Sequence, residues 1–97
     1  MQTEQVQIDP EVQEVLALLG PTAQAAQLTM HSSVEPGLVA QADRRRLRQV
    51  LVNLVTNAIR STPPRGHVRV EAAASLLVEH GYDPGWIRTE RFGATGG

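Results

Sequence analysis

Three polar side chains, Asn53, Asn57 and Arg60, recur at spacings of four and three residues in a chain of 97 residues. At about 100° per residue, such spacing places all three along one side of an α-helix. Carboxamide oxygens can ligate a hard cation such as Mg²⁺, and a guanidinium group can bind phosphate oxygens. The three residues therefore predict a site for a metal-bound phosphate group on a single helix.

One long helix must position these side chains. Asp43 is a good N-cap, because its carboxylate can accept hydrogen bonds from the first free backbone N–H groups. Pro63 ends the helix, since it pushes Thr62 out of the α region. The apolar arc is centred near Leu51 and Leu54, which places the polar row along one border of a buried face. Its apolar residues recur at helical spacing: Leu47, Val50, Leu51, Leu54, Val55 and Ala58.

The segment from Leu47 to Pro63, with Arg46 before it, resembles the N box of sensor histidine kinases, a helix in their ATP-binding domain of the Bergerat (GHKL) fold. The resemblance rests on Arg-Leu-x-Gln, Asn-x-x-x-Asn-Ala and the following Thr-Pro. It departs at Arg60, where lysine is usual, and at Ser61, where an aromatic residue or histidine is common. It implies ATP and Mg²⁺ as ligands, with Asn57 and Asn53 holding the metal and Arg60 touching phosphate oxygens.

Plainer interpretations of the same residues stay open. An asparagine on a helix border is usually solvated, and Arg60 near the helix C-terminus is favoured by the macrodipole without any ligand. ATPase relatives of this fold carry a glutamate general base where Asn53 stands. Because an amide cannot take up that proton, direct hydrolysis of ATP is disfavoured.

The fold class predicted is α/β (α+β): an incomplete two-layer sandwich of Bergerat type, with helices packed on one face of a mixed sheet. The resemblance covers about 6–73, and 1–74 are assigned to the N-terminal part of the kinase-like ATPase domain. The predicted elements begin with a short strand within 1–8 and a helix from N-cap Asp9 to about Gln27, with a break or kink at Gly20-Pro21. Strands 28–34 and 38–42 follow, joined by a turn at Glu35-Pro36-Gly37; they are antiparallel if that turn is a hairpin. The long helix and a strand 67–71 come last.

Residues 75–97 form a divergent, glycine-rich tail, which the resemblance interprets as a remnant of the family's two glycine loops. Asp83-Pro84-Gly85 keeps an Asp-x-Gly, so the resemblance implies Asp83 as the acid that reads the adenine amino group. Segment 76–80 would be the strand before it, Glu90-Arg91-Phe92 resembles the phenylalanine box, and 93–97 would begin the second loop. Alternatively, Asp83 is a turn residue, 72–79 form a short helix and a glycine-rich terminus follows.

Composition excludes several classes of protein. The net charge is −1 and there is no cysteine, so neither a global basic field nor a thiolate metal site is expected. No apolar run is long enough for a bilayer span, so direct membrane insertion is not expected. The absence of cysteine is compatible with a cytoplasmic setting, and the resemblance implies a cytoplasmic protein or the cytoplasmic part of a membrane-bound sensor. The basic run 44–48 is interpreted as a solvated face paired with acids such as Asp43 or Glu71, so nucleic acid is not the expected partner.

The predicted function is that of the ATP-binding catalytic domain, or a fragment of it, of a two-component sensor histidine kinase. The family transfers the γ-phosphoryl group of Mg-ATP to a histidine; none of His31, His67 and His80 has the setting of that acceptor, so it must lie elsewhere. A histidine-containing dimerisation domain and a response regulator are the implied partners. Because the glycine loops are incomplete, we expect this chain alone to be inactive. The alternative is a non-catalytic, degenerate kinase-like module for protein association, including homodimerisation.

Overall fold

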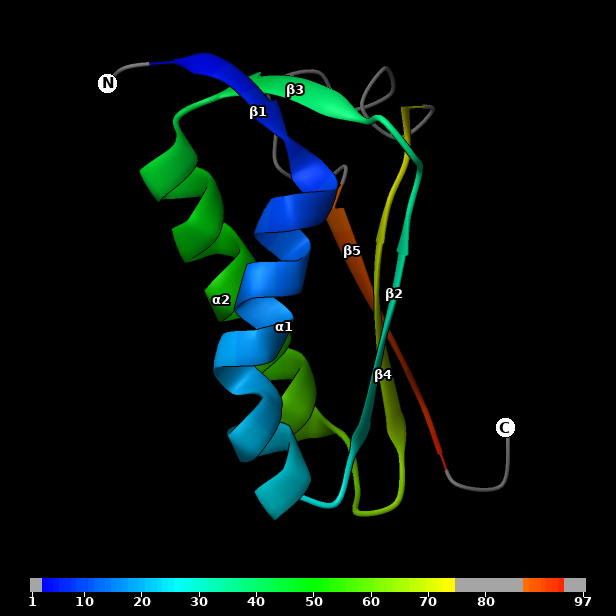
Figure 1. Ribbon diagram of the computed structural model, residues 1–97. Coiled ribbons are helices and arrows are strands. Elements are labelled where there is room, and N and C mark those ends of the chain that lie inside the picture. The colour runs from blue at the N-terminus through cyan, green and yellow to red at the C-terminus, as the bar shows by residue number, and fades with distance from the viewer. Residues whose placement is uncertain (1–2, 75–86, 94–97) are drawn as a thin grey trace.

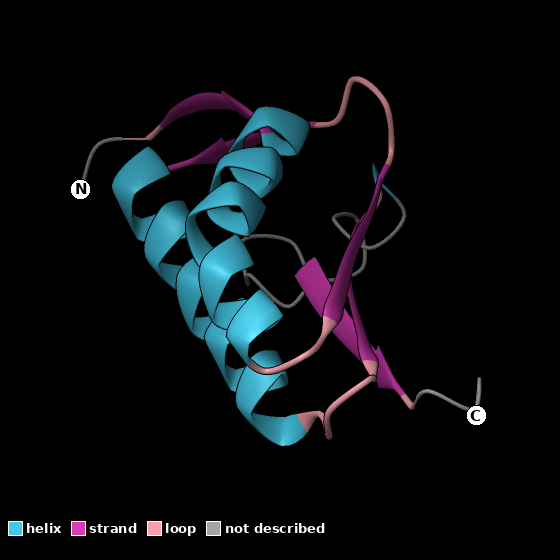
Figure 2. Cartoon of the chain, turned by 60° about the horizontal axis from the view of Figure 1, so that its bottom comes forward, coloured by secondary structure: helices cyan, strands magenta, loops and turns pink. Residues whose placement is uncertain are grey.

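A computed structural model describes residues 3–74 and 87–93, and its two helices cover one face of a three-stranded sheet (Figure 1). Figure 2 shows the same two layers from below, with the helices side by side. The predicted two-layer sandwich of helices on one face of a mixed sheet is therefore confirmed. The elements are β1 (Glu4–Gln7), α1 (Ile8–Ala25), β2 (Thr29–Val34), β3 (Val39–Ala42), α2 (Arg44–Ser61), β4 (His67–Ala72) and β5 (Ile87–Phe92).

The larger sheet has the order β2-β4-β5, with β2 parallel to β4 and β4 antiparallel to β5. A separate two-stranded sheet pairs β1 with β3 in antiparallel register, with Val6 opposite Ala40. The hairpin considered for 28–34 and 38–42 is therefore wrong, because β2 and β3 belong to different sheets. Gly37, at φ +74°, turns the chain away, while Glu35 N–H donates to the carbonyl of Ala72 at 3.0 Å and keeps the end of β2 beside β4.

α1 begins two residues earlier than the sequence predicted. Gln7 rather than Asp9 is the N-cap, and its side chain makes no capping hydrogen bond. The N–H of Ile8 is satisfied instead by the carbonyl of Leu38 at 3.0 Å, because β1 leads directly into the helix beside β3. The helix then continues through Pro21 as one element.

α1 ends at Ala25, two residues before the predicted end. Gln27 adopts a left-handed conformation, with φ +61°. Leu28 N–H donates to the carbonyl of Ala23 at 2.9 Å, and Gln27 N–H donates to that of Gln24 at 3.0 Å. These two bonds form a Schellman motif, which satisfies the last carbonyls of the helix. A glutamine thus takes the position that usually favours glycine.

The core lies between the helices and the larger sheet, where one face of β4 contributes Val68, Val70 and Ala72. The turn between α2 and β4 needs Gly66, since a Cβ there would lie 2.6 Å from Cγ2 of Thr62. Neither helix of the described ranges combines the length and apolarity that crossing a bilayer requires. The remaining buried apolar residues are Val6, Ile8, Val12, Val15, Ala23, Leu28, Leu38, Ala40, Leu47, Leu51, Val55, Ala58, Ile59 and Ile87.

β5 is an element that the sequence did not predict. Its register with β4 places Glu90 opposite Arg69 and Ile87 opposite Ala72. Ile87 is buried, and the Phe92 ring lies with its centroid 4.9 Å from that of His67. Alternation of inward and outward residues, with β-branched Ile87 and Thr89 inward, explains the strand. Glu90-Arg91-Phe92, predicted to be a family motif, is the second half of this strand.

Candidate functional site

The ends of α2 are fixed by local hydrogen bonds. The Asp43 carboxylate accepts from the N–H groups of Arg45 and Arg46 at 3.1 and 3.3 Å, which confirms the predicted N-cap. At the other end, Thr62 leaves the helix with φ −106° and ψ 126°, as expected before a proline. The hydroxyl of Thr62 donates to the carbonyl of Ala58 at 2.7 Å and satisfies one of the last free acceptors.

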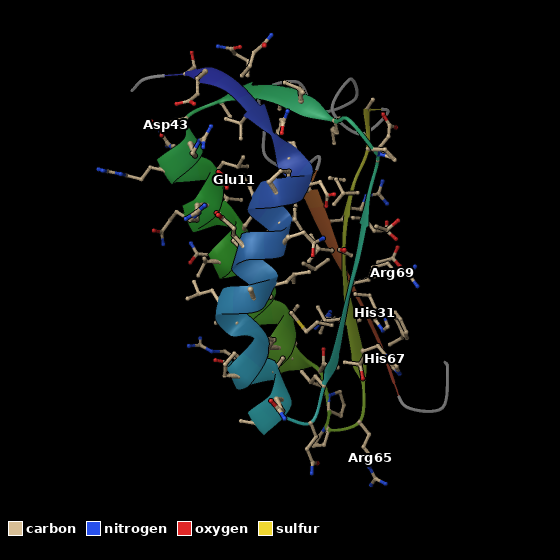
Figure 3. The ribbon with its side chains drawn as sticks, viewed as in Figure 1. Glu11, His31, Asp43, Arg65, His67 and Arg69 are labelled. Carbon is tan, nitrogen blue, oxygen red and sulfur yellow. The ribbon has the colours of Figure 1, made fainter. Side chains whose placement is uncertain are left out.

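α2 is held in place by a buried apolar face and by a carboxylate of α1. Leu51 and Val55 are each 1% exposed, so the middle of the helix is fixed against the core. Glu11 is 4% exposed and accepts a hydrogen bond from Arg48 at 2.8 Å; its second oxygen lies 3.7 Å from Arg44 Nε. In Figure 3, Glu11 points from α1 toward α2, below the Asp43 cap. Arg48 also contacts Glu14.

These acids act on the charge of Arg48. The hydrogen bond to Glu11 and the negative charges of Glu11 and Glu14 raise the pKa of Arg48 above its ordinary value. Two arginines of the basic run are therefore paired with acids, whereas Arg45 and Arg46 form no salt bridge within residues 3–74 and 87–93, and the partners differ from those predicted. Arg44 and Arg48 pair with Glu4, Glu11 and Glu14 of the preceding strand and helix, whereas Glu71 pairs with Arg69.

The predicted polar row lies on the exposed side of α2. Asn53, Asn57 and Arg60 are all exposed and line one depression of about 640 Å³. Leu54, placed by the sequence at the centre of the buried arc, is only partly buried. The core face is therefore centred nearer Leu51, and the polar row lies farther from the core than predicted. The rest of the lining comes from the same helix: Val52, Leu54 and Thr56.

The side chains of the polar row make few hydrogen bonds or salt bridges to other described residues. Within the described ranges, Arg60 forms no salt bridge and the Asn57 side chain forms no hydrogen bond. Asn53 Oδ1 accepts a long hydrogen bond of 3.5 Å from Gln49 Nε2, which restrains its amide. Two amide oxygens and one cation thus face solvent over about two helical turns.

This donor set fits a metal-bound phosphate group. Mg²⁺ binds oxygen ligands and retains several waters, so two exposed amide oxygens can supply its protein contacts. The Arg60 guanidinium, which has no ion pair within the described part of the chain, can bind phosphate oxygens bidentately. A purely acidic or histidine metal site is a poorer description, because residues 3–74 and 87–93 hold no cluster of three such ligands.

Asp83, the fourth predicted nucleotide contact, lies outside the described residues, as does the strand predicted at 76–80. The same holds for most of the glycine loop predicted at 93–97. The structure therefore brings together three of the four predicted site residues, and the contact of Asp83 with adenine stays a prediction.

A second polar cluster, which the sequence did not signal, lies on the sheet face away from the helices. His31 Nε2 is 2.9 Å from His67 Nδ1, and the Arg69 guanidinium lies 5.4 Å from the centroid of the Phe92 ring. Figure 3 shows His31, His67 and Arg69 pointing away from α1 and α2. The two imidazole rings are stacked, with centroids 5.2 Å apart and planes that differ by 20°, and the tautomers decide which of the facing nitrogens donates. Parallel pairing of β2 with β4 creates this contact, which sequence spacing cannot reveal.

Solved structures of similar shape come from histidine kinases. The catalytic domain of ThkA matches 74% of this chain and 50% of its own, with a TM-score of 0.70 and 27% identity. The cytoplasmic segment of QseC shows the same fold, with a TM-score of 0.71 over 76% of this chain. ShkA, solved in complex with AMPPNP, is 31% identical over 76% of this chain and 16% of its own, with a TM-score of 0.69.

Sequence comparison leads to the same class. The histidine protein kinase DivJ of Caulobacter vibrioides is 40% identical over 73 residues, which make up 74% of this chain. The cell-division control histidine kinase PdhS of Brucella canis is 36% identical over 77 residues, or 78% of this chain. The chain spans only 11% and 7% of these two relatives. No family model matches it. Fold and sequence together relate this chain to the catalytic domains of sensor histidine kinases, and confirm the resemblance inferred from the N box.

Proposed function

We propose that this chain is an ATP-binding fragment of a sensor histidine kinase catalytic domain. The observation that carries the proposal is the row of Asn53, Asn57 and Arg60 along one depression, with Arg60 free of ion pairs among the described residues. The solved relative ShkA, which was crystallised with AMPPNP, supports a nucleotide as the ligand.

Each residue of the row has a separate task in this proposal. Asn57 provides an amide oxygen to Mg²⁺, and Asn53, restrained by Gln49, provides a second ligand one turn earlier. Arg60 offsets phosphate charge at the other end of the row. The bound Mg²⁺ would neutralise charge that develops during phosphoryl transfer. None of these side chains can accept a proton from water, so the row favours transfer to an acceptor histidine over hydrolysis.

The acceptor histidine and the response regulator are also proposals, and they rest on similarity to solved histidine kinases. ThkA has been solved in complex with the response regulator TrrA, and its structure matches 72% of this chain with a TM-score of 0.66. We propose that the acceptor histidine belongs to a dimerisation domain outside residues 1–97, and that a response regulator receives the phosphoryl group. A cytoplasmic location follows from this role.

The site is tested by following backbone amide shifts during titration with a non-hydrolysable ATP analogue, with and without Mg²⁺. We expect Mg²⁺-dependent shifts at Asn53, Asn57 and Arg60, and their loss in Asn57→Ala. The matched control is Gln24→Ala, which removes a carboxamide from an exposed position of α1. The absence of shifts at millimolar analogue, or equal loss in both variants, would contradict the proposal.

The adenine contact needs its own test. Asp83 remains the proposed acid, and residues 84–97 contain no other aspartate. Asp83→Asn should reduce the preference for ATP over GTP analogues if Asp83 reads the amino group. An unchanged preference would contradict the role proposed for Asp83.

A second candidate function is non-catalytic association. The observation that favours it is β5, which has a paired neighbour, β4, on one side and no described strand on the other. An unpaired strand edge is a template for another chain.

A further inference from the structure

We propose that two copies of this chain join through β5, antiparallel, with the two-fold axis passing at Thr89. The two three-stranded sheets would then form one sheet of order β2-β4-β5-β5-β4-β2. The proposal makes the association role above specific, and it does not require nucleotide binding.

β5 is held rigidly enough to serve as a template. Ile87 is 3% exposed and lies under α2, which contacts β5 along the inner face of the sheet. On the outer face, the Phe92 ring lies 4.9 Å from that of His67, and Arg69 approaches Glu90 at 3.6 Å. The pairing with β4 extends over all six residues of the strand. Because β5 is already ordered within the single chain, dimerisation does not have to pay the entropic cost of ordering this strand.

The sequence of β5 selects one antiparallel register. In such a pair, residues directly opposite each other share a face, so only registers that keep inward and outward residues matched are allowed. A two-fold axis at Thr89 places Arg88 opposite the second copy's Glu90, and this happens twice. Moving the axis to Arg88, Glu90 or Arg91 places two like charges directly opposite each other, which is destabilising.

The selected register also continues the charge pattern of the existing sheet. Within one chain, Arg69 lies opposite Glu90, and Glu71 lies opposite Arg88. Across the proposed junction, the outer face would read Arg69, Glu90, then the second copy's Arg88 and Glu71, so the sign alternates at each strand. Arg88 is exposed and forms no salt bridge with any residue in 3–74 or 87–93, which leaves it available.

The junction is small, so the dimer should be reversible. One strand pair of six residues buries much less than the roughly 1,000 Å² that marks a stable interface. We therefore expect concentration-dependent dimerisation in the micromolar to millimolar range, and salt should weaken it.

The decisive experiment is sedimentation equilibrium of the full chain, of Arg88→Glu, of Glu90→Lys, and of their equimolar mixture. Each single variant faces like charges across the junction in both pairs, so its dimer dissociation constant should rise about tenfold. In the mixture both pairs become attractive again, so a heterodimer should form with an affinity close to that of the unmodified chain. Circular dichroism of each variant checks that the fold survives.

A monomeric unmodified chain at millimolar concentration would overturn the proposal, as would a mixture no tighter than its components. The register has a separate check in a chain without native cysteine. Thr89→Cys should give a disulfide-linked dimer on mild oxidation, because the two sulfurs would face each other at the axis. Ser33→Cys, exposed on β2 at the opposite edge, is the matched control and should stay monomeric. Equal cross-linking of both variants would contradict the register.

These outcomes separate association from nucleotide binding. Arg88 and Glu90 lie on β5 and take no part in the row of α2, so loss of dimer should leave the Mg²⁺-dependent nucleotide shifts in place. A chain that dimerises but gives no nucleotide shifts would support association alone.

Discussion

The two halves of α2 carry similar polar residues but use them differently. In the first half, Arg44 and Arg48 are engaged by carboxylates of β1 and α1, and Asp43 caps the helix. In the second half, Asn57 and Arg60 have no salt bridge or side-chain hydrogen bond with described groups. Polar residues whose partners come from the same chain stabilise the fold, whereas those left open can bind a ligand. Residue type alone does not separate these two uses.

The largest expected effect concerns what both halves share, the buried face. Leu51→Ala removes a side chain that is 1% exposed and should lower the free energy of unfolding by about 3 kcal/mol. It should also weaken the nucleotide response, because the polar row depends on the position of the helix. Urea unfolding measures the first effect. Val52→Ala, at a partly buried position, is the control and should cost about 1 kcal/mol; equal costs would show that the buried face is placed wrongly.

The next substitution weakens only the charged contacts of the first half of α2. Glu11→Gln keeps the shape of a buried side chain but removes the charge that Arg48 and Arg44 approach. We expect a loss of about 1–3 kcal/mol in unfolding free energy, because a hydrogen bond to a charged group is weakened. Nucleotide-induced shifts should be unchanged.

Glu14→Gln is the matched control for that change. Glu14 contacts the same arginine, but its side chain is 62% exposed, so its removal should cost less than about 1 kcal/mol. A similar cost for both substitutions would mean that burial of Glu11 adds nothing. A change in nucleotide response on replacing Glu11 would mean that the two halves of α2 are coupled.

The sequence predicted α2 well because its signals are local. The Asp43 cap, the apolar period and the proline after Thr62 each act within a few residues, and the structure confirms the cap, the helix and its end. Only the centre of the buried arc was placed wrongly, because Leu54 is partly buried. The two-layer sandwich was also predictable, since the N box resemblance indicated the fold. Which strands pair was not predictable, because hydrogen bonding of β2 to β4 and of β1 to β3 depends on tertiary packing.

The candidate site was predictable to a similar extent, and for the same reason. Three of its residues follow from spacing on one helix, and the structure places them at one depression. The acids that engage the basic run were not predictable, because Glu4 and Glu11 approach it only after α1 folds against α2. The contact between His31 and His67, 36 residues apart, likewise depends on strand register.

The smallest expected effect is on ligand binding, and it compares two arginines of α2, one in each half of the helix. Arg60→Gln should weaken binding of the ATP analogue about three- to tenfold, since one charge-assisted contact to phosphate is lost. Arg60→Lys should retain most of the affinity, because a lysine ammonium can still meet phosphate as a point charge. Both variants are measured by the same titration at two salt concentrations, and the arginine contribution should shrink as salt rises.

Arg45→Gln provides the counterpart from the first half of α2. Arg45 is an exposed arginine of the same helix, but it lines the other depression, with Asp43 and Glu4, rather than the one beside Asn57. Its replacement removes the same charge from the chain, so any general electrostatic effect on an anionic ligand is matched. If Arg45→Gln and Arg60→Gln weaken binding equally, long-range charge explains the affinity and Arg60 makes no specific contact. If only Arg60→Gln weakens it, the open half of α2 is the phosphate-binding half.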